Sequence, residues 1–169
     1  MPSIRPAGDR DATPIAGIYN HYIQHSIATF EEQPVTAEVI RQRVESVKRR
    51  GLPWLVAEEQ GDIVGYSYAS PFHPRVGYRH SIEISVYLKD GLQSRGLGAA
   101  LYRELFSQLN LGSIHMLIAC ISLPNEPSVA LHEKLGMKKT AHFNEVGRKF
   151  DRWIDVGYWQ MPLSQISSA

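Results

Sequence analysis

The chain lacks several features that would place it in a specialised class of protein. It has 169 residues and a single cysteine, Cys120, so no internal disulfide can form and nothing requires an oxidising compartment. It has no apolar run near the roughly 20 residues that a membrane-spanning helix needs. Residues 1–10 are polar and carry no hydrophobic signal region. We therefore expect a cytoplasmic protein with no membrane partner.

Neither sign of charge is in excess. The 18 basic and 17 acidic residues leave a formal net charge of +1, a balance that does not favour nucleic acid as a partner. The run 48–50 is basic but short, and we interpret it as a helix end. His21 and His25 have helical spacing, but Tyr22 stands where a His-Glu-x-x-His zinc motif needs glutamate. We expect no metal.

What is present is the composition of an ordinary globular protein. Hydrophobic residues make up 43% of the chain and charged residues 21%. The length suits one domain with a core of its own, so residues 1–169 are expected to form a single domain. Cys120 lies in an apolar stretch, which favours a small buried residue over a catalytic thiol.

Hydrophobic periodicity predicts alternating helices and strands. Helical spacing occurs over residues 13–26, 36–50, 97–109 and 128–135. Strand-like patterns occur over 3–5, 54–58, 63–70, 81–88, 115–121, 138–146 and 152–160. This order indicates a single mixed α/β domain.

The most informative segment lies between a predicted strand and a predicted helix. It reads Gln93-Ser94-Arg95-Gly96-Leu97-Gly98-Ala99-Ala100. Gly96 and Gly98 let backbone amides approach an anion, and the helix start adds unpaired N–H groups and its positive dipole end. Arg95 and Lys89 add positive charge, so the segment predicts a pyrophosphate site.

Other phosphate motifs fit this segment poorly. A dinucleotide fingerprint requires a third glycine at position 101, where Leu101 stands. The nucleotide P-loop requires Gly-Lys-Ser/Thr, which is missing. The remaining alternative is a glycine turn that caps a helix and binds no ligand.

Two motifs together resemble the coenzyme-binding segments of the GCN5-related N-acetyltransferase (GNAT) superfamily. They are Gln93-x-x-Gly96-x-Gly98 and Asn125-x-x-Ser128-x-x-x-His132-x-x-x-Gly136-Met137. Segments 29–36, 83–87, 123–133 and 153–160 are similar to the phosphinothricin N-acetyltransferase-like members. The resemblance implies a central, mostly antiparallel twisted sheet of six to seven strands flanked by about four helices. It also implies acetyl-CoA as co-substrate and, as in many family members, a homodimer.

The same resemblance implies which residues bind the coenzyme and which acceptor is acetylated. The acceptor would be a small glutamate-like amino acid such as phosphinothricin, methionine sulfoximine or methionine sulfone. The residues expected to bind the coenzyme are Val86, Leu88, Gln93, Ser94, Arg95, Gly96, Leu97, Gly98, Ala99, Asn125 and Ser128. For Val86, the resemblance implies a backbone N–H that stabilises the oxyanion.

Glu83 is the candidate general base. Acetyl transfer needs a neutral amine, whereas an amino group with a pKa near 8 or above is mostly protonated at pH 7. Alternation along the strand points Glu83 away from Ile82 and Ile84, and partial desolvation there would raise the pKa of the carboxyl. We expect it to act through a water molecule. The alternative is an exposed strand carboxylate.

His132 is the second candidate catalytic residue. Most members of the superfamily carry tyrosine at this position, where it is assigned as the acid for the leaving thiolate. His132 is expected to protonate that thiolate or to hold the coenzyme chain. The alternative is a histidine satisfied by contacts on a helix face.

An acceptor with a carboxylate and a phosphinyl or sulfonyl tail needs hydrogen-bond donors. Arg75 and Arg79 are the candidates, because a guanidinium binds such groups bidentately. Phe30 and Tyr78 are expected to wall the pocket. The alternatives are solvated loop arginines and aromatic core residues.

Two rival functions remain open at this point. A cationic acceptor such as a polyamine or an aminoglycoside, or a protein N-terminus, would favour a carboxylate-rich site. The segment 71–81 contains no acid, which favours an anionic acceptor. The other rival is a non-catalytic acyl-CoA-binding module on the same fold.

Overall fold

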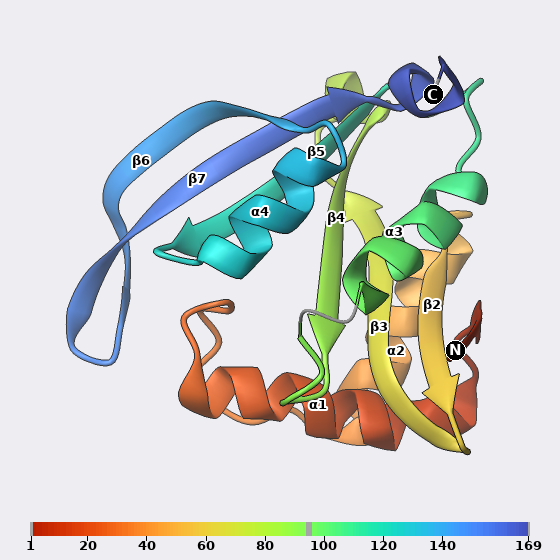
Figure 1. Cartoon of the computed structure of the whole chain (residues 1–169), viewed down its shortest axis with the longest axis vertical. Coiled ribbons are helices and arrows are strands. Elements are labelled where there is room, and N and C mark those ends of the chain that lie inside the picture. Colours follow the sequence, from red (N-terminus) through yellow and green to blue (C-terminus); the bar gives the residue numbers. More distant parts are fainter. Residues whose placement is uncertain (1, 94–95, 169) are drawn as a thin grey trace. The chain divides into compact units, whose positions relative to one another are not determined.

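The computed structural model describes residues 2–93 and 96–168 (Figure 1). Its strands are β1 (Ser3–Pro6), β2 (Trp54–Glu59), β3 (Asp62–Pro71), β4 (Ser81–Leu88), β5 (Met116–Leu123), β6 (Lys138–Lys149) and β7 (Arg152–Pro162). Its helices are α1 (Ala12–His25), α2 (Ala37–Arg49), α3 (Leu97–Ser107) and α4 (Glu126–Lys134). Short 3-10 helices at Asp9–Asp11, Val76–Tyr78 and Leu163–Ser168 were not predicted.

The strands form one hydrogen-bonded sheet in the order β1-β2-β3-β4-β5-β7-β6. Strand β1 runs antiparallel to β2, β2 to β3, and β7 to both β5 and β6, while β4 and β5 are parallel. The expected mixed α/β fold with a mostly antiparallel sheet is therefore confirmed, with seven strands and four α-helices among the described residues.

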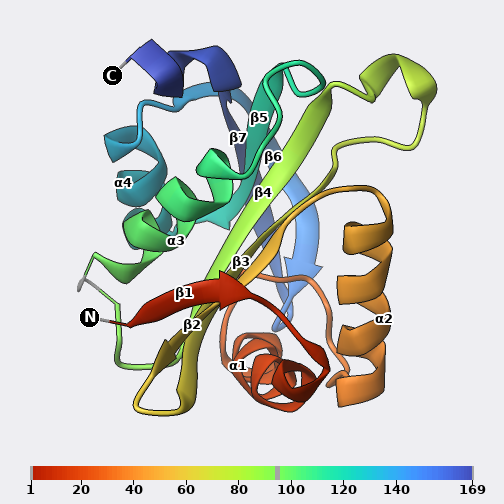
Figure 2. The same cartoon turned by 90° about the vertical axis from the view of Figure 1, so that its right-hand side faces the viewer.

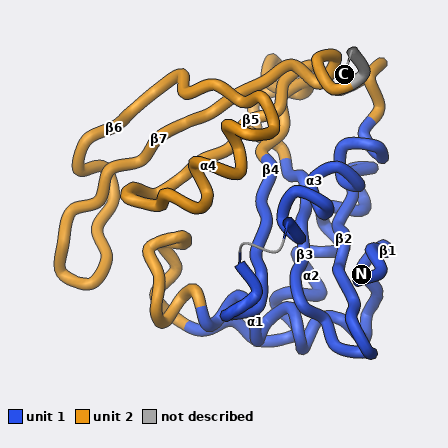
Figure 3. The backbone as a smooth tube through the Cα atoms, viewed as in Figure 1, with its two compact units in different colours: residues 1–21, 34–70, 84–109 blue, residues 22–33, 71–83, 110–169 orange. Residues whose placement is uncertain are grey.

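The chain divides into two compact units (Figure 3). The first unit comprises residues 1–21, 34–70 and 84–109, and the second comprises residues 22–33, 71–83 and 110–169. The boundary crosses β4 between Glu83 and Ile84. That residues 1–169 work as a single domain stays a prediction.

In the first unit, helices cover both faces of the strands. Helix α3 lies on one face, and α2 and most of α1 lie on the other (Figure 2). Helix α2 begins where the side chain of Thr36 accepts a hydrogen bond of 3.2 Å from the N–H of Val39, and it ends before Gly51, whose φ is +71°. Fully buried Leu55 and Leu101 belong to the core of this unit.

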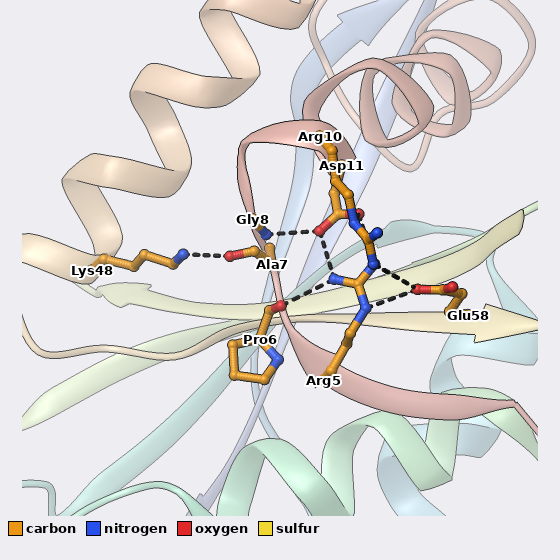
Figure 4. Close-up of polar contacts among 8 residues, drawn as sticks. All are labelled: Arg5, Pro6, Ala7, Gly8, Arg10, Asp11, Lys48 and Glu58. Carbon is orange, nitrogen blue, oxygen red and sulfur yellow. Dashed lines mark hydrogen bonds and ion pairs between the residues drawn. The ribbon is translucent and has the colours of Figure 1, made fainter. Parts of the chain in front are cut away.

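An ion-pair network joins β1, β2 and the turn before α1 (Figure 4). The Arg5 guanidinium donates hydrogen bonds of 2.7 and 2.8 Å to Asp11 and one of 2.8 Å to Glu58. Asp11 also accepts a hydrogen bond of 2.7 Å from the N–H of Gly8. The pKa of the Asp11 carboxyl is lowered, and the hydrogen bond from Arg5 is the largest cause. The Arg5–Asp11 pair therefore fixes the first strand to the turn that precedes α1.

In the second unit, β5, β7 and β6 form a long antiparallel ladder with α4 packed on β5. Trp159 of β7 is almost fully buried, and its indole N–H donates a hydrogen bond of 3.1 Å to the carboxylate of Glu133 in α4. A Cβ at Gly157 would lie 2.8 Å from Cη2 of this indole, so the ring needs a bare backbone there. The contact holds α4 against the sheet.

Candidate active site

The predicted phosphate segment leads into α3 in the first unit. Gly96 is the N-cap of α3 and has φ +76°, a conformation that glycine adopts without strain. The N–H groups of the first turn have no acceptor within the helix, and no acidic residue occurs there. These groups fit a coenzyme pyrophosphate. Two of the predicted contacts, Ser94 and Arg95, lie outside the described residues.

Helix α3 is anchored so that its start stays close to the end of β4. Leu97, Gly98 and Leu101 are buried, Ala99 is half-buried, and Gln93 is exposed in the preceding turn. A Cβ at Gly65 would lie 2.7 Å from Cδ2 of Leu88 and 3.3 Å from Cδ1 of Leu101. Glycine at position 65 therefore permits the close packing of β3, β4 and α3.

Glu83 occupies the position on β4 that alternation predicted. Ile82 and Ile84 are buried on one face, and Glu83 is half-buried on the other. Burial raises the pKa of the Glu83 carboxyl, as expected. The pairing of β4 with β5 covers Ser81–Glu83 and Met116–Ile118, so Glu83 is the last paired residue and Val86 lies three residues further along the strand.

Strand register places an aromatic cluster on the same sheet face as Glu83. Ile118 pairs with Glu83, Cys120 lies two residues further along β5, and Tyr158 of β7 pairs with Cys120. Paired residues share a face, as do alternate residues of one strand. The Tyr158 ring also meets Phe72 edge-on, with the ring centroids 6.4 Å apart. We call Phe72, Tyr78, Cys120, Phe143 and Tyr158 the Tyr158 cluster.

The remaining rings extend this cluster on both sides. Phe143 packs edge-on against Tyr158, with ring centroids 5.8 Å apart, and Tyr78 packs edge-on against Phe72 at 5.9 Å. Tyr78 is 45% exposed and Phe143 is 50% exposed. A partly open aromatic surface of this kind can bind the apolar part of a small molecule.

The polar atoms of the cluster are held in their neutral forms. Burial, followed by a hydrogen bond with Cys120, raises the pKa of the Tyr158 hydroxyl to about 12. Burial around the sulfur raises the pKa of the Cys120 thiol, and the Glu83 charge raises it further. The residue Cys120 as a whole is nevertheless exposed, so the prediction of a buried cysteine was wrong. Its side chain points to the open sheet face, away from Leu117 and Ala119.

His132 is buried in α4, with 3% of the residue exposed. Its Nδ1 lies 2.7 Å from the carbonyl oxygen of Ser128, and because a carbonyl only accepts, Nδ1 carries the proton and donates. Burial lowers the pKa of His132, so the imidazole is neutral at pH 7. The hydrogen bond to Ser128 thus fixes the orientation of the His132 imidazole against its own helix.

The start of α4 carries the other two predicted coenzyme contacts. Asn125 is the N-cap of α4, and its Oδ1 accepts a hydrogen bond of 3.3 Å from the N–H of Ser128. The Ser128 hydroxyl lies 3.4 Å from Nδ1 of His132. Asn125, Ser128 and His132 therefore form one connected group at this end of the helix.

Both predicted acceptor-binding arginines flank the short helix Val76–Tyr78. Arg75 is its N-cap and Arg79 its C-cap, and both are exposed. The Arg79 guanidinium donates a hydrogen bond of 3.2 Å to the carbonyl oxygen of Val76. Among the residues that the structure describes, no carboxylate pairs with either guanidinium. Both side chains can therefore engage an anion.

Phe30 lies against the long hairpin of the second unit. Its ring packs on Gly147 of β6 and is 39% exposed. Gly147 pairs with Ile154 of β7, which is on the same face as Val156 and Tyr158. The predicted wall residue therefore belongs to the face that carries the Tyr158 cluster.

Over residues 2–93 and 96–168, no group of three or more His, Cys, Asp or Glu side chains is arranged to hold a metal ion. No helix in the same part of the chain is long and apolar enough to cross a membrane.

The family model for the acetyltransferase (GNAT) domain matches residues 4–157. The chain is 38% identical over 157 residues to a phosphinothricin N-acetyltransferase of Streptomyces viridochromogenes, which covers 93% of this chain and 85% of that protein. It is 33% identical over 168 residues to an L-methionine sulfoximine/L-methionine sulfone acetyltransferase of Pseudomonas aeruginosa. That alignment covers 99% of this chain and 98% of the other protein.

Solved structures show the same similarity. A putative acetyltransferase from Salmonella typhimurium, solved with acetyl-CoA, has a TM-score of 0.93 at 33% identity, covering 96% of this chain and 94% of that one. A ribosomal-protein-alanine N-acetyltransferase from Brucella melitensis has a TM-score of 0.91 at 37% identity. That match covers 95% of this chain and 99% of the other. The chain therefore belongs to the GNAT acetyltransferase family. It is an N-acetyltransferase that uses acetyl-CoA as co-substrate.

Sequence reasoning did not predict that the residues of the Tyr158 cluster come together. Phe72, Cys120, Phe143 and Tyr158 meet only through strand register, which the sequence does not display. Alternation along 152–160 was a usable signal, since it sets Tyr158 on the face opposite Trp159. Lys149 was also missed, because a charged residue between two strand patterns is ordinarily interpreted as part of an exposed turn.

Proposed function

We propose that the enzyme acetylates the α-amino group of a small glutamate-like amino acid: phosphinothricin, methionine sulfoximine or methionine sulfone. The observation that carries the proposal is the raised-pKa carboxyl of Glu83 beside an aromatic surface. The loop that leads into the same strand carries Arg75 and Arg79, neither of which is paired with a described carboxylate. The names of the phosphinothricin and methionine sulfoximine acetyltransferases among the relatives support this acceptor class.

Glu83 is the proposed general base. Its carboxylate accepts a proton from the acceptor ammonium through a water molecule, and the neutral amine then attacks the thioester carbonyl carbon. A carbon–nitrogen bond forms, and the carbonyl oxygen becomes an oxyanion that the N–H of Val86 is proposed to stabilise. Collapse of this intermediate breaks the carbon–sulfur bond, and the leaving thiolate of coenzyme A takes up the second proton, which the nitrogen loses as it becomes an amide. The raised pKa of Glu83 brings it closer to the pH at which a base works efficiently.

For His132, the arrangement supports a role in holding the coenzyme segment. A protonated imidazole would be the form that donates to a thiolate, and burial disfavours that form. The bonded Nδ1 instead fixes the imidazole to Ser128. We propose that His132 keeps Asn125 and Ser128 in position for the pantetheine arm.

A homodimer in the cytoplasm is the proposed state of the enzyme. The β6–β7 hairpin exposes Val146 (59%), Phe150 (51%) and Trp153 (61%), and such apolar side chains commonly lie in interfaces. Light scattering after size exclusion should give the mass of two chains. A Trp153→Ser variant should shift the mass toward one chain.

The test of the activity measures free thiol released from acetyl-CoA. Methionine sulfoximine, methionine sulfone and phosphinothricin are compared with spermidine, an aminoglycoside and an alanyl peptide, using wild type and Glu83→Gln. Turnover restricted to the glutamate-like amino acids supports the acceptor class. Turnover of none of these amines, with acetyl-CoA still bound, would indicate a non-catalytic module.

A protein N-terminus is the second candidate acceptor, because one similar structure bears the name of a ribosomal-protein-alanine N-acetyltransferase. The alanyl peptide tests this alternative directly. If the peptide is turned over and methionine sulfoximine is not, the second candidate replaces the first.

A further inference from the structure

Lys149, at the end of β6, is a buried lysine with three carbonyl oxygens around its ammonium. Only 3% of the residue is exposed. Its Nζ donates hydrogen bonds of 2.7 Å to the carbonyls of Ser26 and Thr29, and 3.5 Å separates it from the carbonyl of Tyr22. All four residues belong to the second unit. The contact joins residues more than a hundred positions apart.

This arrangement offsets the cost of burying a charge. An ammonium has three N–H donors and no acceptor, and here three carbonyls face it. Helix α1 ends at His25, so the carbonyls of Tyr22 and Ser26 lie at its negative dipole end. Desolvation lowers the pKa of Lys149, while the charge of Glu32 raises it. Lys149 thus fastens the segment 26–33 to the hairpin.

Gly147, two residues before Lys149, receives the ring of Phe30 from that same segment. A Cβ at position 147 would lie 2.6 Å from Cε2 and 2.8 Å from Cε1 of the ring. Real Cβ atoms do not approach so closely, so a side chain at position 147 would have to displace the ring. Gly147 is not in the left-handed region of backbone conformation, and the requirement for glycine therefore comes from Phe30.

These two contacts define how Phe30 is placed. Lys149 holds the backbone at Thr29, one residue before Phe30, and Gly147 receives the ring. Because Gly147 pairs with Ile154, the ring lies on the sheet face of Val156, Tyr158 and Glu83. We propose that Lys149 is a positioning residue, which fixes Phe30 as a wall of the acceptor site and so sets the affinity for the acceptor. This inference rests on the proposed function.

The first test replaces Lys149 with methionine, which keeps the length of the side chain and removes the donors. Lys149→Met should raise the KM for methionine sulfoximine by about 10- to 100-fold, because a small displacement of a positioning group is costly. The KM for acetyl-CoA should stay within about twofold. Lys138→Met, an exposed lysine on the same strand, is the matched control and should change neither value.

Lys149→Arg covers the case in which the methionine variant does not fold. Arginine keeps the cation but cannot place its fork on the same three carbonyls, so it should raise the acceptor KM by a smaller factor. Melting temperatures are measured for every variant. A rise in both KM values together with a lower melting temperature would indicate a merely structural role and overturn the proposal.

A double-mutant cycle tests whether Lys149 acts through Phe30. Lys149→Met and Gly147→Ala should each raise the acceptor KM in the wild-type background. In a Phe30→Ala background both substitutions should have little further effect, because the ring that they displace is missing. Additive effects would overturn the mechanism.

Failure of this inference is distinguishable from failure of the proposed function. If wild type acetylates none of the glutamate-like amino acids, the proposed function fails, whatever the variants do. If wild type acetylates methionine sulfoximine and Lys149→Met leaves its KM unchanged, only the positioning role fails.

Discussion

Cys120 and Tyr158 face each other as a cross-strand pair on β5 and β7, and the thiol is hydrogen-bonded to the phenol. The Tyr158 hydrogen bond lowers the pKa of the thiol, whereas burial and the Glu83 charge raise it, and burial is the largest of the three effects. An exposed cysteine beside the candidate base is therefore less reactive than its exposure suggests.

Alkylation of this single cysteine measures that balance. With iodoacetamide at pH 7.5, wild type should react more slowly than a free cysteine, because less thiolate is present. Glu83→Gln removes a negative charge and should speed the reaction, while Tyr158→Phe removes a hydrogen bond and should slow it. Mass spectrometry follows the label, and Cys120→Ser is the blank. Slower labelling of Glu83→Gln would contradict the electrostatic coupling.

The pH dependence of catalysis tests Glu83. The base must be ionised, so kcat/KM should fall as the pH drops through the raised pKa of Glu83. Glu83→Gln should lower kcat by about 10²- to 10⁴-fold and remove this acid limb. Initial rates between pH 5 and 9 measure both effects. Glu59→Gln, an exposed carboxylate on β2, should keep the wild-type profile.

Asp11 should contribute stability that depends on pH. Its folded-state pKa is lowered, so the contribution is present above the unfolded value near 3.9 and is lost as the pH falls through the folded value. At pH 7, Asp11→Asn should lower the free energy of unfolding by about 1–3 kcal/mol. Urea unfolding at pH 7 and in strong acid provides the comparison. Asp9→Asn, in the same turn and exposed, should have little effect at either pH.

His132 should make the folded state less stable in mild acid. Burial lowers its folded-state pKa, so the unfolded chain binds a proton near pH 6.5 that the folded chain does not. Stability is then lost as the pH falls below that value. His132→Gln, whose amide can still donate to Ser128, should flatten the dependence of melting temperature between pH 7.5 and 5. His115→Gln, at an exposed position, should leave the slope unchanged, and parallel slopes for all three proteins would contradict the assignment.

Much of the fold was predictable because local signals agree with the tertiary structure. Helix α2 has a capping threonine before it and a glycine after it, and β4 matches its predicted bounds at both ends. Boundaries shifted where local chemistry decides them. Helix α4 begins at Glu126 rather than Ser128, because Asn125 is its N-cap and Pro127 suits the first turn.

The candidate site was less predictable, because it depends on which residues stand opposite one another. Alternation alone gave the orientation of Glu83, and the structure agrees. The partners Cys120 and Tyr158 required the register of β5 against β7. Lys149 required the path of the chain after α1, which no local pattern encodes.

The division of the chain into two units gives its tryptophans distinct uses as optical probes. Trp54 is buried in the first unit and stacks on Tyr68 with ring centroids 4.1 Å apart, whereas Trp159 is buried in the second unit against α4. Trp153 is exposed in the single chain and would add a third signal. In a Trp153→Phe background, substituting one of the two buried indoles at a time gives two variants with a single tryptophan each, one in the first unit and the other in the second. The two emission traces then report whether the halves of the enzyme melt together or one after the other.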